Sequence, residues 1–129
     1  MKSIKIWTVG RFLLLSAFLW LVCCDGDVLP SGGSAALLVK NQSDKTFNRI
    51  SVSKLINAEK HEYKNVAEIK FNFTSGSSKT ISGFNEGSYD VVVGDNLILT
   101  VYLKDGQTTT VTVVKRSGNW GDYYELVEE

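Results

Sequence analysis

An alternation of apolar and polar residues constrains the fold of this chain more than any other feature. It is clearest over residues 66–73, where every second residue from Ala67 to Phe73 is apolar and the residues between them are polar. Successive side chains of a β-strand point to opposite faces of the sheet, so this pattern predicts a strand with one face in a core.

Shorter runs of the same kind recur and are separated by Gly, Asn, Asp and Ser residues. They cover residues 36–39, 47–52, 79–84, 89–93, 97–103, 108–114 and 123–127. About eight such strands predict an all-β fold, a single antiparallel β-sandwich of about seven or eight strands over residues 35–129. The turns at residues 74–78 and at Asp105-Gly106 are expected to close hairpins.

Three details of this sandwich follow from local patterns. Residues 97–103 carry apolar side chains on both faces, which favours a central strand. The threonine-rich face of residues 108–114 is expected to face solvent. Residues 54–65 contain good helix formers without a continuous apolar stripe, so we expect a polar loop with one or two helical turns.

Two turn-plus-strand motifs resemble a known type of module. Residues 87–93 read G-x-Y-x-V-x-V and residues 106–113 read G-x-T-x-x-V-x-V. Both are similar to elements of the prealbumin-like and Ig-like β-sandwich modules of bacterial surface proteins. Residues 39–43, followed by a strand, resemble small bacterial lipoproteins. The resemblance implies a fold and does not carry a function with it.

The amino-terminal residues have the pattern of a secretory signal. Three basic residues precede Phe12–Cys24, a run of 13 residues without a charge. Thirteen helical residues rise about 20 Å, less than the hydrocarbon core of about 30 Å. Residues 1–23 are therefore predicted to be a signal peptide and not a membrane span.

The end of this run resembles a bacterial lipobox. Leu21, Val22 and Cys23 precede Cys24, which the resemblance makes the lipidated first residue of the mature protein. Cys23 replaces the usual Gly, Ala or Ser before the lipidated cysteine. Two acyl chains give durable membrane attachment where one does not. The alternative is an ordinary signal peptide and a soluble secreted protein.

Residues 24–34 are interpreted as the lipidated amino terminus and a flexible tether, because they hold the only proline and a Gly-Gly pair. Cys23 and Cys24 are the only cysteines, and two adjacent cysteines cannot close a loop with a disulfide. After cleavage the chain carries 11 basic and 14 acidic residues, a formal charge of −3. This charge gives no electrostatic reason to bind nucleic acid.

The sequence contains no recognisable catalytic constellation. His61 is the only histidine and lies among charged residues, so we expect it to be solvated. The carboxylates at Asp95, Asp105 and Asp122 adjoin Gly or Asn, as turn-forming residues do, and they lack the spacing of a calcium loop. No enzyme activity, cofactor or metal is predicted. A glycosidase-type pair of carboxylates stays open as a rival, because spatial separation is invisible in a sequence.

One polar and aromatic cluster is a candidate ligand surface. It lies near the carboxyl end and consists of Asn119, Trp120, Asp122, Tyr123 and Tyr124. Such side chains can stack on sugars or hold a peptide. The favoured alternative is structural: Trp120 would plug the end of the sandwich, and one of the two tyrosines would point into the core.

The sequence therefore predicts a membrane-anchored bacterial lipoprotein of the cell envelope, on the periplasmic or the surface face. Its partners would be membrane lipid, through acylation, and an envelope protein or glycan. It would act as a non-catalytic binding or spacer module. The alternative is a soluble secreted recognition domain that binds glycan or protein through Trp120–Tyr124.

Overall fold

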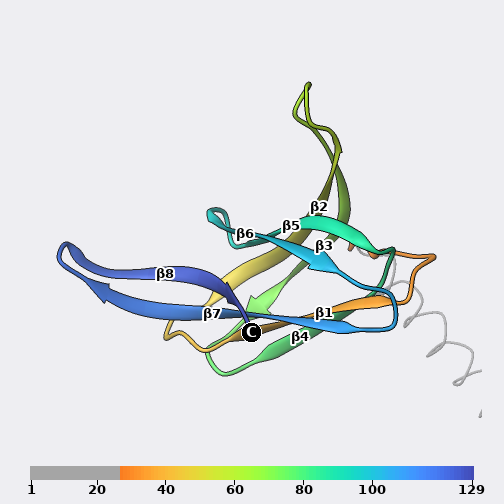
Figure 1. Cartoon of the computed structure of the whole chain (residues 1–129). Helices are drawn as coiled ribbons and strands as arrows, with labels where there is room; N and C mark the ends of the chain where they lie inside the picture. Colours follow the sequence, from red (N-terminus) through yellow and green to blue (C-terminus); the bar gives the residue numbers. More distant parts are fainter. Residues whose placement is uncertain (1–26) are drawn as a thin grey trace, which may run out of the picture.

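The computed structural model describes residues 27–129, which form eight β-strands (Figure 1). The strands are β1 (Ala35–Asn41), β2 (Phe47–Asn57), β3 (Glu62–Phe73), β4 (Ser78–Phe84), β5 (Gly87–Val93), β6 (Leu97–Leu103), β7 (Thr108–Gly118) and β8 (Gly121–Glu128). Among these described residues, no helix is long and apolar enough to cross a membrane. The predicted signal peptide and the lipobox with Cys24 lie outside the described residues.

The strands form two four-stranded sheets that pack as a sandwich. One sheet has the order β4-β1-β7-β8 and the other has the order β3-β2-β5-β6. Neighbouring strands are antiparallel except β1 and β7, which run parallel. The predicted all-β sandwich is confirmed, with one parallel pair inside the otherwise antiparallel arrangement.

Two of the predicted turns carry the chain from one sheet to the other. β3 and β4 lie in different sheets, and so do β6 and β7, which the turn at Asp105-Gly106 connects. That turn is tight, with Gly106 at φ 72° and a hydrogen bond of 3.1 Å from the Gln107 amide to the Lys104 carbonyl. The predicted hairpins are therefore wrong although the turns are present, because turn residues encode a reversal and not the strand that lies alongside.

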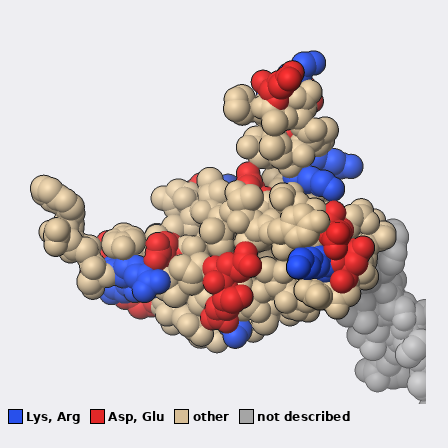
Figure 2. Space-filling view, in the orientation of Figure 1, with Lys and Arg blue, Asp and Glu red and all other residues tan. Residues whose placement is uncertain are grey.

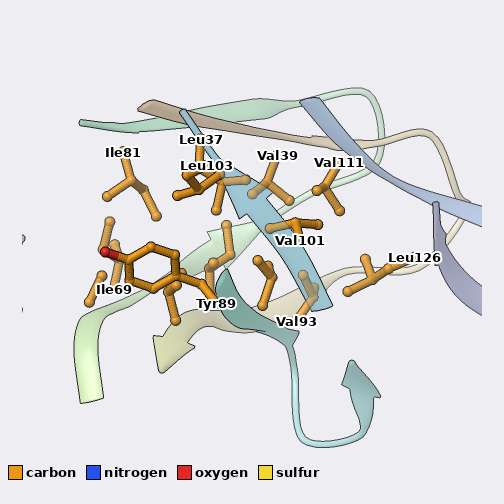
Figure 3. Close-up of a cluster of buried hydrophobic side chains, with 14 of the residues drawn as sticks. Leu37, Val39, Ile69, Ile81, Tyr89, Val93, Val101, Leu103, Val111 and Leu126 are labelled. Atoms are coloured by element: carbon orange, nitrogen blue, oxygen red, sulfur yellow. The ribbon is translucent and has the colours of Figure 1, made fainter. Parts of the chain in front are cut away.

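The core lies between the two sheets and is filled by the inward positions of the alternating strands. Figure 3 shows side chains from the two sheets pointing toward one another. The largest fully buried side chains are Phe73, Phe84, Leu37, Ile50, Ile81 and Leu103. Val66–Phe73 largely behaves as its alternation predicts: Ala67, Ile69 and Phe73 are buried, and Phe71 is half-buried against the core.

Residues 54–65, expected as a polar loop, instead extend two strands. They complete β2 and begin β3, and the turn between the strands lies at residues 58–61. Leu55 pairs with Tyr63 there, and both side chains are exposed. Figure 1 shows this hairpin projecting from the sandwich, as does the outer part of the β7–β8 hairpin. We call them the β2–β3 arm (residues 54–64) and the β7–β8 arm (residues 115–124).

Two further expectations about strands are wrong. β6 is an edge strand and not a central one, because it pairs only with β5, and its outward residues Ile98 and Tyr102 are exposed. Thr112, on the threonine-rich face of β7, is buried and not solvated. Its hydroxyl donates a hydrogen bond of 2.9 Å to the Glu129 carboxylate, which satisfies the polar group away from water.

Residues 27–33, predicted to be part of a free tether, lie against one side of the sandwich. Val28 and Glu68 exchange two backbone hydrogen bonds of 2.9 and 2.8 Å, so Val28 extends the sheet at the edge of β3. The Gly33 amide donates to the Gly83 carbonyl at 3.1 Å on β4. We call residues 27–33 the stem. It adds one backbone pairing to the edge of β3, at Glu68, and one hydrogen bond to β4, at Gly83.

Gly33→Ala is expected to detach the stem. A Cβ atom at Gly33 would lie 1.8 Å from the Phe84 carbonyl oxygen, so the two backbones must separate. Overpacking of this kind costs about 1–3 kcal/mol, and hydrogen exchange at the Val28 amide should become about tenfold faster. Ser31→Ala, at an exposed stem position, is the matched control. Unchanged exchange in Gly33→Ala would contradict the close packing.

Candidate functional site

The predicted ligand surface lies on the β7–β8 arm. Asn119 and Trp120 form the two-residue loop between the paired residues Gly118 and Gly121. The side chain of Trp120 is fully exposed, at 102%, so the expectation that it plugs the sandwich is wrong. A side chain in a two-residue loop stands beyond the last strand pair and has no core to enter. Figure 2 shows no charged side chain at the tip of this arm, and both basic and acidic side chains at its base.

The other three predicted residues, Asp122, Tyr123 and Tyr124, belong to β8 at the base of the arm. Asp122 is exposed and Tyr123 is 49% exposed. Tyr124 is half-buried, with its ring edge-on to Phe47 at a centroid distance of 6.4 Å. Neither tyrosine belongs to the buried core, so that expectation is also wrong.

A network of polar contacts joins the base of the arm to the loop between β1 and β2. The Tyr124 hydroxyl donates to Asp44 Oδ1 at 2.7 Å, and Lys115 Nζ donates to Asp44 Oδ2 at 2.8 Å. Lys115 also lies 3.3 Å from an Asp122 carboxylate oxygen. These contacts tie the arm to the sandwich at its base.

The same contacts move the pKa values of the groups that make them. The hydrogen bond from Lys115 lowers the pKa of Asp44 below its usual value. The hydrogen bond to Asp44 raises the pKa of Lys115 and that of Tyr124. Each shift favours the ordinary charge state at neutral pH, because a lowered pKa keeps Asp44 ionised and a raised pKa keeps Lys115 charged and Tyr124 neutral. The network therefore consists of charged and neutral partners that hold the base of the arm in place.

A cleft of about 270 Å³ opens beside this network. It lies between the β1–β2 loop, the start of β6 and the base of the β7–β8 arm, and it is lined by Lys45, Phe47, Asn96, Leu97, Tyr123 and Tyr124. Phe47 reaches it by packing over Gly94, where an added Cβ would lie 3.0 Å from the ring. The lining combines aromatic rings with an amide and one ammonium group. We call it the Lys45 cleft.

The ammonium group of Lys45 lies 5.4 Å from the centroids of both the Phe47 and the Tyr124 rings. Cations at this distance are attracted to ring faces. Within residues 27–129, no carboxylate forms a salt bridge with Lys45. The positive charge at the cleft is therefore free to pair with a ligand.

Buried Asn41 holds the loop that carries Lys45. Its Nδ2 donates to the carbonyls of Lys45 and Phe73, at 2.8 and 3.0 Å. Its Oδ1 accepts hydrogen bonds from the Ser43 amide (3.1 Å) and the Ser43 hydroxyl (2.6 Å). Because one side chain satisfies all these groups, the loop has a fixed shape without contributing to the apolar core.

The fold brings together only part of the predicted surface. Tyr123 and Tyr124 line the cleft, whereas Asn119 and Trp120 lie at the far end of the arm. Sequence reasoning missed Lys45, Phe47, Asn96 and Leu97. No local motif marks them, since they come from two turns and two strand ends that only the fold brings close.

The residues weighed for catalysis or metal binding lie elsewhere. His61 is exposed in the turn of the β2–β3 arm, with φ at 51°. Asp95 pairs with Arg49 at 3.2 Å, and Asp122 pairs with Lys115. Residues 27–129 hold no group of three or more side chains placed to bind a metal ion.

Comparisons with known families, curated proteins and solved structures find no match to this chain.

Proposed function

We propose that this chain is a membrane-anchored bacterial lipoprotein whose sandwich serves as a non-catalytic binding or spacer module of the cell envelope. The signal-like residues 1–23 and the lipobox at Cys24 motivate this proposal. The observation that carries it is the lipobox-like run Leu21–Cys24 at the end of an uncharged stretch. The backbone pairing of Val28 with Glu68 adds where the chain leaves the sandwich.

This pairing makes the proposed anchor a short one. An extended chain covers at most about 3.6 Å per residue, so the four residue steps from Cys24 to Val28 can span at most about 14 Å. Acyl chains on Cys24 would hold the β3 edge next to the lipid surface. In Figure 1 the stem and the tip of the β7–β8 arm lie at opposite ends of the molecule. The arm would then point away from the membrane, toward a partner.

We also infer that the sandwich is of the prealbumin-like or Ig-like type. The two motifs that carry this resemblance fall in β5 and in β7 with the turn before it. The positive φ of Gly106 fits the turn that opens the second motif.

Cys24→Ala is expected to abolish lipidation and, with it, cleavage in front of residue 24. The cells are labelled with a radioactive fatty acid and fractionated, and wild type should carry label in the membrane fraction. Because cleavage at a lipobox follows acylation of the cysteine, the unlabelled variant should also keep residues 1–23 and migrate as a longer precursor.

Cys23→Ala is the matched control for that experiment. It changes the neighbouring thiol but leaves Cys24 in place, so it should stay labelled and membrane-bound. Label retained by Cys24→Ala, or a wild type without label, would contradict lipidation at Cys24.

The second candidate is a soluble secreted recognition domain that uses the Trp120–Tyr124 surface. The fully exposed Trp120 and the aromatic cleft at the base of the same arm favour it. Exposed aromatic side chains are common anchors of interfaces. This candidate predicts unlabelled wild-type protein, free in the culture medium, so the same fractionation separates the two.

A further inference from the structure

The Lys45 cleft lies on the side of the sandwich whose strand edges are open. β6 pairs only with β5, and β8 pairs only with β7, so each is the last strand of its sheet. At the other two edges, the stem binds β3 through Val28 and β4 through Gly33. Within the described residues, the stem therefore pairs with β3 at Glu68 and with β4 at Gly83, and no segment pairs with the outer edges of β6 and β8.

Residues at the ends of these two open strands line the cleft. Leu97 begins β6, and Tyr123 and Tyr124 belong to β8. A strand edge offers backbone N–H and C=O groups to an extended peptide, which adds to the sheet as a further strand. Open backbone groups beside an aromatic cleft favour a peptide over a sugar as the occupant.

The residues that line the cleft indicate which kinds of side chain the bound peptide would carry. Phe47, Leu97 and the tyrosines offer apolar surface, and a volume of about 270 Å³ suits one large side chain. The ammonium of Lys45, without a carboxylate partner in the described part of the chain, offers a positive charge at the same place. An apolar residue next to an acidic one matches both features.

We propose that the Lys45 cleft binds an extended peptide segment in which a large apolar residue adjoins Asp or Glu. The peptide lies along an open edge of β6 or β8, places its apolar side chain against the rings, and pairs its carboxylate with Lys45. This deepens the proposed binding function and rests on that function, but it is independent of lipidation at Cys24.

An array of immobilised seven-residue peptides with varied central pairs tests this proposal. The probe is the full chain, extracted from membranes in detergent or collected from medium. Wild type should select peptides in which Phe, Leu or Ile adjoins Asp or Glu. Replacing that acid with its amide should weaken binding about fivefold, because a solvent-exposed ion pair contributes up to about a factor of five.

Two substitutions of the exposed residue Lys45 test whether its charge sets the preference for an acidic residue. Lys45→Met should remove the preference for the acid, and Lys45→Glu should reverse it toward Lys and Arg. Lys104→Met, at an exposed lysine outside the cleft, is the control and should bind as wild type does. Loss of the acid preference in both Lys45 variants but not in the control supports the site.

The backbone part of the proposal has its own test. Methylating alternate backbone nitrogens of the best peptide should abolish binding, since an added strand needs those donors. Undiminished binding of the methylated peptide, a selection that Lys45→Met leaves unchanged, or no peptide retained above the Lys45→Met background would each overturn the proposal. Failure of the Cys24 labelling would not affect any of these outcomes.

Discussion

Phe73→Ala is expected to lower the free energy of unfolding by about 3–5 kcal/mol, the range found for removing a buried aromatic side chain from a core. Phe73 is fully buried, its ring lies 5.3 Å from that of Phe71, and it is among the largest side chains of the core. Small domains are stable by only about 5–15 kcal/mol, so the variant should lose a large share of its stability. Urea unfolding followed by circular dichroism measures the change.

Tyr102→Ala is the control for this substitution. Tyr102 is also a large aromatic residue, but it is 50% exposed on the outer face of β6. Its removal leaves no cavity, so we expect a loss below about 1 kcal/mol. If Phe73→Ala were as mild as Tyr102→Ala, the position of Phe73 between the two sheets would be wrong.

Asn41→Ala is expected to cost about 2–6 kcal/mol, because two buried polar groups lose their partner and each costs about 1–3 kcal/mol. The substitution removes the donor to the Phe73 carbonyl and the acceptor of the Ser43 amide, both within the buried network. It also frees the Lys45 carbonyl, so the loop at the cleft should lose its shape. Urea unfolding and amide exchange of residues 42–46 report the two effects.

Asn48→Ala, at an exposed position of β2, is the matched control and should stay within about 0.5 kcal/mol of wild type. In Asn41→Ala, exchange of the loop amides should become faster even under conditions in which the protein remains folded. A variant that is destabilised without faster loop exchange would mean that Asn41 supports the core and not the loop.

The alternating pattern predicts strands well where each strand has one face in the core. Residues 66–73 show this, because Ala67, Ile69 and Phe73 enter the core as expected. The alternating pattern does not indicate which strands pair with one another in a sheet. The turn at Asp105-Gly106 is present, but it leads from β6 in one sheet to β7 in the other.

The remaining errors arise where tertiary contacts override a local signal. Thr112 is polar, yet the hydrogen bond to Glu129 allows its burial. Residues 54–65 lack a clear strand pattern because both faces of the β2–β3 arm are largely exposed and no core selects alternate residues. Lys45 and Leu97 are far apart in sequence, so the spacing of residues along the chain could not predict that they line one cleft.

The loop position of Trp120 has a practical consequence. Trp7 and Trp20 precede the expected cleavage point, so residues 25–129 contain a single indole, at the tip of the β7–β8 arm. Tryptophan fluorescence of the mature domain, excited at a wavelength that tyrosine does not absorb, would report only on this tip and not on the interior. A blue shift of the emission would indicate that a bound molecule covers the tip. Binding at the β7–β8 arm could therefore be followed in the native protein without an attached dye.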